Sequence, residues 1–255
     1  MIFKVGVSSM DATGIGDNVI ITAVVRELKK KFPDAEVEVY SEGHPELFMY
    51  NPNVKKVYKQ FGGDTGYIGS GHYIEKICRF YSIENPSLKG DIYLNEEEKE
   101  FAKELEMIKA CCLHPAIYNW PYENWEKLCI FLDENGFYPL QIGPSYSGKD
   151  FLRMQEQGLT RSKSVPVKNI KYCDIRYREI TVREMCSVIF NSDFFIGYNS
   201  GPMHIATAFE KKAICISRKD QFEEFCYPQN KNFIISTFDL EDIQDFIQKN
   251  WMPTI

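Results

Sequence analysis

The sequence lacks the long apolar segments that mark membrane proteins. No run among its 255 residues approaches the ~18 consecutive apolar residues that a membrane-spanning helix needs. Its first residues lead directly into a strand-like stretch, without the apolar core and small-residue cleavage site of a signal peptide. We therefore expect a cytoplasmic protein with no transmembrane segment, and leave open a peripheral contact with the inner membrane.

Positive charge is also scarce. The chain has 30 Lys and Arg residues against 36 Asp and Glu residues, which gives a formal net charge of −6. A protein that binds nucleic acid needs a basic face. We therefore expect no nucleic-acid partner, while the hydrophobic fraction of 44% and the charged fraction of 26% are ordinary for a folded enzyme.

Signatures of disulfides and metal sites are missing as well. The eight cysteines form no C-x-x-C pair, and several lie in apolar runs, which predicts buried thiols in a reducing compartment. No D-x-D occurs, the usual carboxylate pair for Mg²⁺ or Mn²⁺ on a sugar nucleotide. The four histidines show no close metal-ligand spacing. We predict that the protein uses no metal ion and no cofactor.

Strand and helix patterns alternate along the chain and predict an α/β fold with parallel sheets. In the first half we predict strands at 2–8, 36–40 and 54–58, with helices at 17–31, 73–80 and 95–106. In the second half we predict strands at 109–114, 138–143, 194–197 and 213–216, with helices at 123–133, 203–209 and 239–251 and another that follows a capping box at Thr181.

The two series predict two Rossmann-like domains that face each other across a cleft. We place the first domain at 1–107 and the second at 108–238. The remaining segment, 239–255, is a C-terminal helix that could pack back on the first domain. Ligands of such folds bind at the carboxyl ends of the parallel strands.

A glycine-containing turn follows the first strand and contains the first candidate site. Gly14 and Gly16 let the backbone turn sharply and approach a ligand, and Asn18 lies beside them. Asp17 in this turn can accept a proton from a hydroxyl group, although an Asp at this place also suits a helix cap. Asp11 is a weaker candidate for the same role.

A second candidate site lies between the strand at 194–197 and the next helix. Ser200 is a natural helix cap, and Pro202 suits a first helical turn. Exposed N–H groups at Ser200, Gly201 and Met203 would attract phosphate, and His204 in the first turn could point at the same anion. The alternative is an ordinary capped helix with a partly buried histidine.

The segment 143–150 nearly matches the P-loop pattern G-x-x-x-x-G-K-[ST]. It begins with Gly143 and includes Lys149, but Asp150 replaces the hydroxyl that should bind Mg²⁺. We interpret it as a loop that contacts a nucleotide without P-loop geometry, and keep a P-loop NTPase or kinase as a less favoured alternative.

Together these stretches resemble glycosyltransferase family 9, the ADP-heptose:lipopolysaccharide heptosyltransferases, which have the GT-B fold. The resemblance rests on four blocks, at 14–36, 51–54, 113–115 with 120–125, and 200–206, and it implies that domain 1–107 is on the acceptor side and that domain 108–238 binds the nucleotide sugar. It implies an inverting, metal-independent glycosyltransferase that moves a heptose-like sugar from a nucleotide diphosphate donor, with an ADP-linked sugar as one option, to an acceptor hydroxyl. The acceptor, whether glycan, lipid-linked or protein, stays open.

The resemblance also assigns roles to individual residues. It implies that Asp17 is the catalytic base, and that the diphosphate is held by Asn199, Ser200, Gly201 and His204. The family has Asp-Thr where this chain has Asn199-Ser200, and a basic residue where it has Tyr118, for which Lys149 or Arg218 could compensate. These departures motivate a second hypothesis, a non-catalytic protein that binds sugar nucleotides on a degenerate transferase scaffold.

Overall fold

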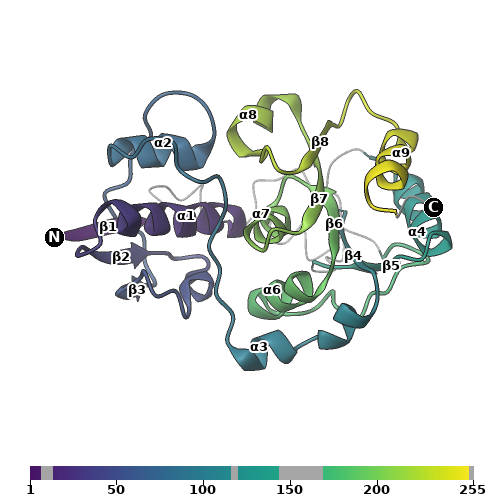
Figure 1. The fold of residues 1–255 in the computed structure, drawn as a ribbon, viewed down its shortest axis with the longest axis horizontal. Helices are drawn as coiled ribbons and strands as arrows, with labels where there is room; N and C mark the ends of the chain where they lie inside the picture. The colour runs from purple at the N-terminus through teal and green to yellow at the C-terminus, as the bar shows by residue number, and fades with distance from the viewer. Residues whose placement is uncertain (7–13, 116–119, 144–168, 253–255) are drawn as a thin grey trace, which may run out of the picture.

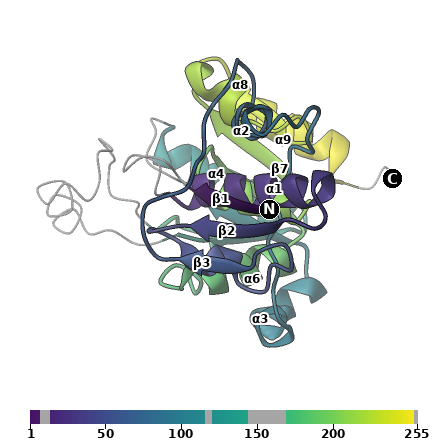
Figure 2. The ribbon, with the colours of Figure 1, turned by 90° about the vertical axis from the view of Figure 1, so that its left-hand side faces the viewer.

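The structure is a computed structural model that describes residues 1–6, 14–115, 120–143 and 169–252. Its first sheet has three parallel strands in the order β1 (Ile2–Gly6), β2 (Glu36–Tyr40) and β3 (Lys56–Tyr58), as Figure 2 shows. Val37 and Val39 of β2 are buried, whereas the glutamates that alternate with them are more exposed. Helix α1 (Ile15–Lys31) packs on this sheet and on α2 (Tyr73–Phe80).

The second sheet has five parallel strands in the order β5-β4-β6-β7-β8 (Figure 1). These are β4 (Ala110–His114), β5 (Tyr138–Gln141), β6 (Phe194–Tyr198), β7 (Lys212–Ser217) and β8 (Lys231–Ile234). Side chains of β6 alternate between the two faces of the sheet. Phe195 therefore belongs to the buried apolar cluster on one face, and Phe194 belongs to the cluster on the other face. Both faces are therefore buried, as in other parallel sheets.

In the described part of the chain, four helices cover these two faces. On one side lie α6 (Val182–Asn191) and α7 (Gly201–Ala208), and their cluster continues through α1 into the first sheet. On the other lie α4 (Tyr122–Glu134) and α9 (Leu240–Asn250), whose buried residues include Trp125 and Ile243. The first sheet and α7 thus share one continuous apolar core.

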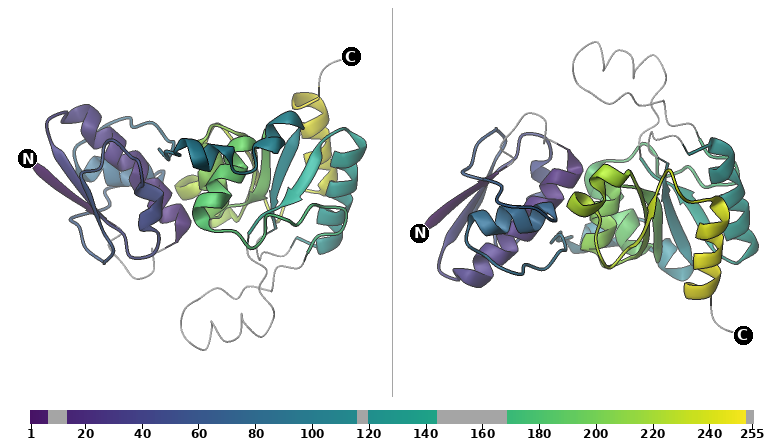
Figure 3. Two further views of the ribbon diagram at one scale, coloured as in Figure 1. Left: turned by 90° about the horizontal axis from the view of Figure 1, so that it is seen from below. Right: turned by 90° about the horizontal axis from the view of Figure 1, so that it is seen from above.

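The C-terminal helix does not pack back on the first domain, the position that the sequence analysis left open. Ile243, Ile247 and Trp251 are buried in the cluster that also contains Phe194 and Trp125. Figure 3 shows α9 beside α4, at the end of the molecule away from the N-terminus. The apolar face of α9 determines this position, because the sheet face next to α4 would otherwise be exposed.

The helix predicted at 95–106 is interrupted. The structure has α3 (Glu96–Glu100) and then a 3-10 helix, η2 (Lys103–Met107). The Asn191 side chain donates hydrogen bonds to the carbonyls of Lys99 and Phe101, and Ala102 has a φ of 61°. These bonds satisfy carbonyls that a continuous helix would use itself, so the helix ends.

Other boundaries differ by a few residues. Helix α1 begins at Ile15 and not at residue 17, and β8 and the short helices η1 (Pro45–Phe48), η3 (Lys219–Gln221) and α8 (Phe222–Phe225) were not predicted. The capping box predicted at Thr181 is present, and a second one at Asn95 begins α3. Seven of the eight cysteines are buried free thiols. The predicted domain boundary after residue 107 lies between the two sheets and stays a prediction. Within the described ranges, no helix is long and apolar enough to cross a membrane.

Candidate active site

One pocket lies where the first turns of α1 and α7 meet. It has a volume of about 260 Å³ and is lined by Gly14, Ile15, Gly16, Asp17, Ile20, Asn199, Ser200, Gly201, His204, Gln221 and Phe225. Eight of these residues come from the two motifs singled out in the sequence, at 14–18 and 198–204. The fold therefore brings both motifs, which are more than 180 residues apart, to one site.

Two glycines permit this close approach of the helix starts. A Cβ atom on Gly201 would lie 2.5 Å from the Cβ of Ile15, and one on Gly16 would lie 2.7 Å from Cδ2 of His204. Real Cβ atoms do not come this close to other carbon atoms. Glycine at these positions is needed for packing, and not for an unusual backbone angle.

Asp17 is the third residue of α1, and Gly14 takes the capping position. The half-buried carboxylate of Asp17 accepts hydrogen bonds from the backbone N–H groups of Gly14 and of Asp17 itself. Burial raises the pKa of Asp17 to about 6, more than those hydrogen bonds lower it. A carboxyl group with this pKa can accept and release a proton near neutral pH.

The start of α7 is not capped by its own side chain. Ser200 occupies the capping position, but its Oγ donates to the Tyr198 carbonyl at 3.0 Å. The same Oγ lies 3.0 Å from Nδ1 of His114, and since its single hydrogen is used, it accepts there. Among the described residues, the N–H groups of Ser200 and Gly201 have no acceptor. A helix start in this state attracts an anion.

Two neutral histidines flank this helix start. Burial lowers the pKa of His114 to about 4 and that of His204 to about 3, so neither ring is charged at neutral pH. His204 is 4% exposed, and its Nδ1 lies 2.7 Å from the hydroxyl of Tyr227. Positive charge at the pocket therefore comes from backbone dipoles and not from imidazolium groups.

Three predicted site residues do not line the pocket. The Met203 side chain is fully buried, and its N–H donates to the Ser200 carbonyl. Asn18 is buried too; its Nδ2 donates to the Gly14 carbonyl at 2.9 Å, and its Oδ1 accepts from Ser41 at 2.7 Å. Gly143 packs on His114 with a φ of 92°. These residues hold the segments around the pocket in place instead of facing a ligand.

Other predicted residues lie elsewhere. Asp11, Tyr118 and Lys149 are outside the described residues, as is the near-P-loop segment after Gly143. Arg218 follows β7 and forms an exposed ion pair with Asp220, with 3.0 Å between Nε and Oδ1. In the described part of the chain, no three His, Cys, Asp or Glu side chains are grouped as a metal site would require.

Sequence reasoning missed the part of the site that follows β7. Gln221 and Phe225 line the pocket, and Tyr227 lies directly behind His204. Gln221 and Phe225 belong to the short helices η3 and α8, which are too short to show helical periodicity in the sequence, and Tyr227 follows them. The rule that ligands bind at the carboxyl ends of parallel strands was a usable signal, because this segment follows such an end.

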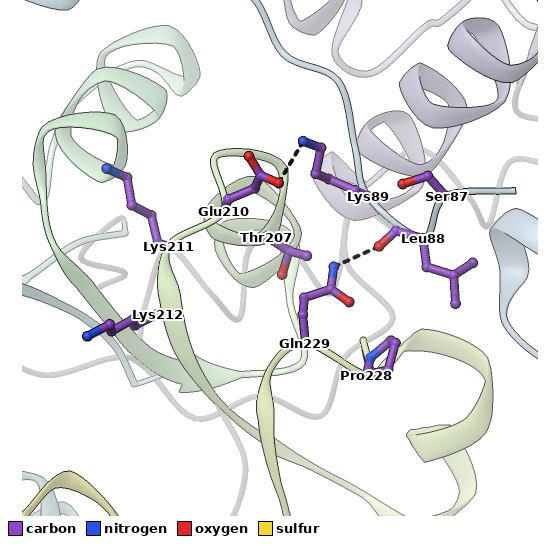
Figure 4. Close-up of a pocket in the computed structure, with 9 residues that line it drawn as sticks. All are labelled: Ser87, Leu88, Lys89, Thr207, Glu210, Lys211, Lys212, Pro228 and Gln229. Atoms are coloured by element: carbon purple, nitrogen blue, oxygen red, sulfur yellow. Dashed lines mark hydrogen bonds and ion pairs between the residues drawn. The ribbon is translucent and has the colours of Figure 1, made fainter. Parts of the chain in front are cut away.

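A larger pocket lies at the opposite end of α7 (Figure 4). It has a volume of about 480 Å³, and the Lys89–Glu210 ion pair, with 3.0 Å between its charged atoms, crosses it. Gln229 donates to the Leu88 carbonyl at 2.8 Å, and the side chains of Lys211 and Lys212 point away from these groups. None of the residues predicted for chemistry lines this pocket, so the pocket beside Asp17 is the candidate active site.

Comparison with known families finds one that fits this arrangement. The sequence model of glycosyltransferase family 9 (heptosyltransferase) matches residues 83–254 of the chain. A search of curated proteins finds no match.

Several solved structures have a similar shape. ADP-heptose lipopolysaccharide heptosyltransferase II of E. coli has a TM-score of 0.70 at 12% identity, with 97% of each chain covered. A glycosyltransferase family 9 protein of Veillonella parvula has a TM-score of 0.69 at 11% identity, over 99% of this chain and 90% of that one. E. coli heptosyltransferase WaaC, solved with ADP, has a TM-score of 0.62 at 12% identity over 98% of each chain. The likeness confirms the predicted GT-B-like fold.

Proposed function

Since the chain belongs to glycosyltransferase family 9, we propose that it is an inverting glycosyltransferase that moves a sugar from a nucleoside diphosphate to an acceptor hydroxyl. The observation that carries this proposal is the pocket that Asp17 shares with the uncapped start of α7. One side offers a proton acceptor, and the other offers N–H groups for an anion.

In the proposed reaction Asp17 is the base. The acceptor hydroxyl gives its proton to the carboxylate while its oxygen forms a bond to the anomeric carbon. The bond from that carbon to the diphosphate oxygen breaks, and its electron pair leaves with the diphosphate. Because the oxygen attacks opposite the leaving group, the anomeric configuration inverts.

The start of α7 stabilises the leaving group in this proposal. The N–H groups of Ser200 and Gly201 would donate to the diphosphate, and the dipole of α7 favours negative charge there. Each hydrogen bond to a charged group contributes ~1.5–3 kcal/mol, so several can take the place of a metal ion. We therefore expect full activity in the presence of EDTA.

The donor that we propose is an ADP-linked heptose or a closely similar sugar nucleotide. The structure of E. coli WaaC with ADP supports the choice of nucleotide, together with membership of the heptosyltransferase family. A thermal-shift panel of ADP, GDP, UDP and their sugars tests it. A ligand at a hundred times its Kd should stabilise the protein by ~2.7 kcal/mol.

Asp17→Ala tests the catalytic assignment. We expect this variant to bind ADP normally and to transfer no sugar, because the diphosphate lies at α7 and the proton acceptor is lost. Asp133→Ala, which removes an exposed carboxylate on α4, is the matched control and should keep full activity. Near-normal turnover by Asp17→Ala would refute the role of Asp17, and loss of activity in EDTA would refute metal independence.

A further inference from the structure

A cluster of three rings lies behind the proposed diphosphate site. The ring of Tyr227 contacts His72, tilted by 48° at a centroid distance of 4.7 Å, and meets His204 edge-on at a centroid distance of 5.4 Å. All three side chains are buried, with exposed fractions of 0% for Tyr227, 3% for His72 and 4% for His204. His72 comes from the first half of the chain, at the start of α2, and the other two come from the second half.

The hydrogen bond between Tyr227 and His204 has two possible directions. A neutral imidazole carries one N–H, and a tyrosine hydroxyl carries one hydrogen. If Nδ1 of His204 donated, the hydroxyl hydrogen would need another acceptor, and the described residues offer none. A buried donor without a partner costs stability. The hydroxyl therefore donates to Nδ1, which leaves the imidazole hydrogen on Nε2.

The Nε2 atom faces the site. His204 lines the pocket, and a Cβ atom placed on Gly16 would lie 3.0 Å from Nε2. Burial keeps the ring neutral, because it lowers the pKa of His204 to about 3. An N–H at this position offers a hydrogen bond to an anion, whereas a bare nitrogen would repel it.

We propose that Tyr227 is a positioning residue, which fixes His204 as the Nε2–H tautomer so that it donates a hydrogen bond to the diphosphate of the donor. This inference rests on the proposed function for its ligand. Tyr227 itself does not touch the substrate, and it acts only through His204.

His72 holds Tyr227 from the other half of the chain. Its Nδ1 accepts from the Ile74 N–H at 3.2 Å, and the N–H of His72 donates to Glu75, so the ring is fixed as the cap of α2. The contact between the rings of His72 and Tyr227 thereby links the position of α2 to the tautomer of His204. Asn is also a good helix cap, so His72→Asn removes the ring and keeps the cap.

Imidazole nitrogen NMR of the full-length protein measures the tautomer directly. The chain has only four histidines, and His204→Asn identifies the His204 signals. In the wild-type protein without ligand we expect the hydrogen on Nε2. In Tyr227→Phe, which loses only the hydroxyl, we expect a mixture of both tautomers and ADP binding about tenfold weaker.

Two further variants complete the test. Tyr138→Phe removes another tyrosine hydroxyl, which donates to Asp174, and should leave the His204 tautomer and ADP binding unchanged. His72→Asn should weaken ADP binding less than Tyr227→Phe, and the double variant should bind no more weakly than Tyr227→Phe alone.

Each outcome decides the inference. A wild-type His204 with its hydrogen on Nδ1 overturns it without any variant, even if Tyr227→Phe does not fold. A tautomer that persists as Nε2–H in Tyr227→Phe, or unchanged ADP binding, overturns it as well. Failure of the wild-type protein to bind ADP, GDP or UDP overturns the proposed function and the ligand named here, whereas the tautomer is still measured independently.

Discussion

Asp17→Asn should make the protein more stable while it removes sugar transfer. Burial raises the pKa of this carboxyl group from 3.8 to about 6, so the folded protein holds the proton more tightly than the unfolded chain does. A shift of about two pKa units corresponds to ~3 kcal/mol of lost stability once the group is ionised. Because the side chain is only half-buried, solvent screens part of this unfavourable energy. We therefore expect Asp17→Asn to raise the free energy of unfolding by about 1–2 kcal/mol.

The pH dependence of this effect identifies its cause. Above pH 6 the folded protein carries the ionised carboxylate and the loss of stability is complete. It shrinks as the pH falls through the folded pKa, and it is absent below the unfolded value of 3.8. The neutral amide of Asn never ionises. The variant should therefore be more stable than the wild-type protein at pH 8 and equally stable near pH 3.5.

Urea unfolding at both pH values measures the difference. The exposed Asp133→Asn is the control and should change stability little at either pH. An Asp17→Asn variant that is no more stable than the wild-type protein at pH 8 would show that the carboxylate is not held in an unfavourable environment. A gain of equal size at both pH values would assign the effect to packing instead of charge.

Two other predictions follow from the pocket. The value of kcat/KM for the acceptor should fall about tenfold per pH unit below pH 6, because the base must be ionised; a profile that is flat down to pH 5 would exclude Asp17. Gly16→Ala should weaken ADP binding by more than about tenfold, since the new methyl group would lie 2.7 Å from the His204 ring, and normal affinity by calorimetry would contradict the close approach of α1 and α7.

The elements that the sequence predicted well are those with local signals. Thr181 and Asn95 begin helices with capping boxes, and the buried strands of the second sheet follow apolar runs. The Gly14–Asp17 turn and the Ser200–Gly201 helix start each have a local pattern. Their meeting in one pocket was expected only because parallel strands place their carboxyl ends on one edge and because of the family resemblance.

What the sequence did not predict depends on distant partners. Ser200 has the residue type of a helix cap, but its hydroxyl forms a hydrogen bond with His114, 86 residues away, instead of capping α7. The helix predicted at 95–106 is interrupted by the side chain of Asn191, and Tyr227 gains its role only through His204. Local sequence preferences cannot predict such contacts, because the hydrogen-bond partner comes from a part of the chain that is distant in sequence.

The diversion of the Ser200 hydroxyl has a consequence beyond catalysis. Without a side-chain cap, the first turn of α7 depends on water or on a bound anion to complete its hydrogen bonds. A donor nucleotide would then serve as the missing cap and hold α7 against α1. Under the proposed function, the resistance of the protein to proteolysis should therefore rise with the concentration of the sugar nucleotide.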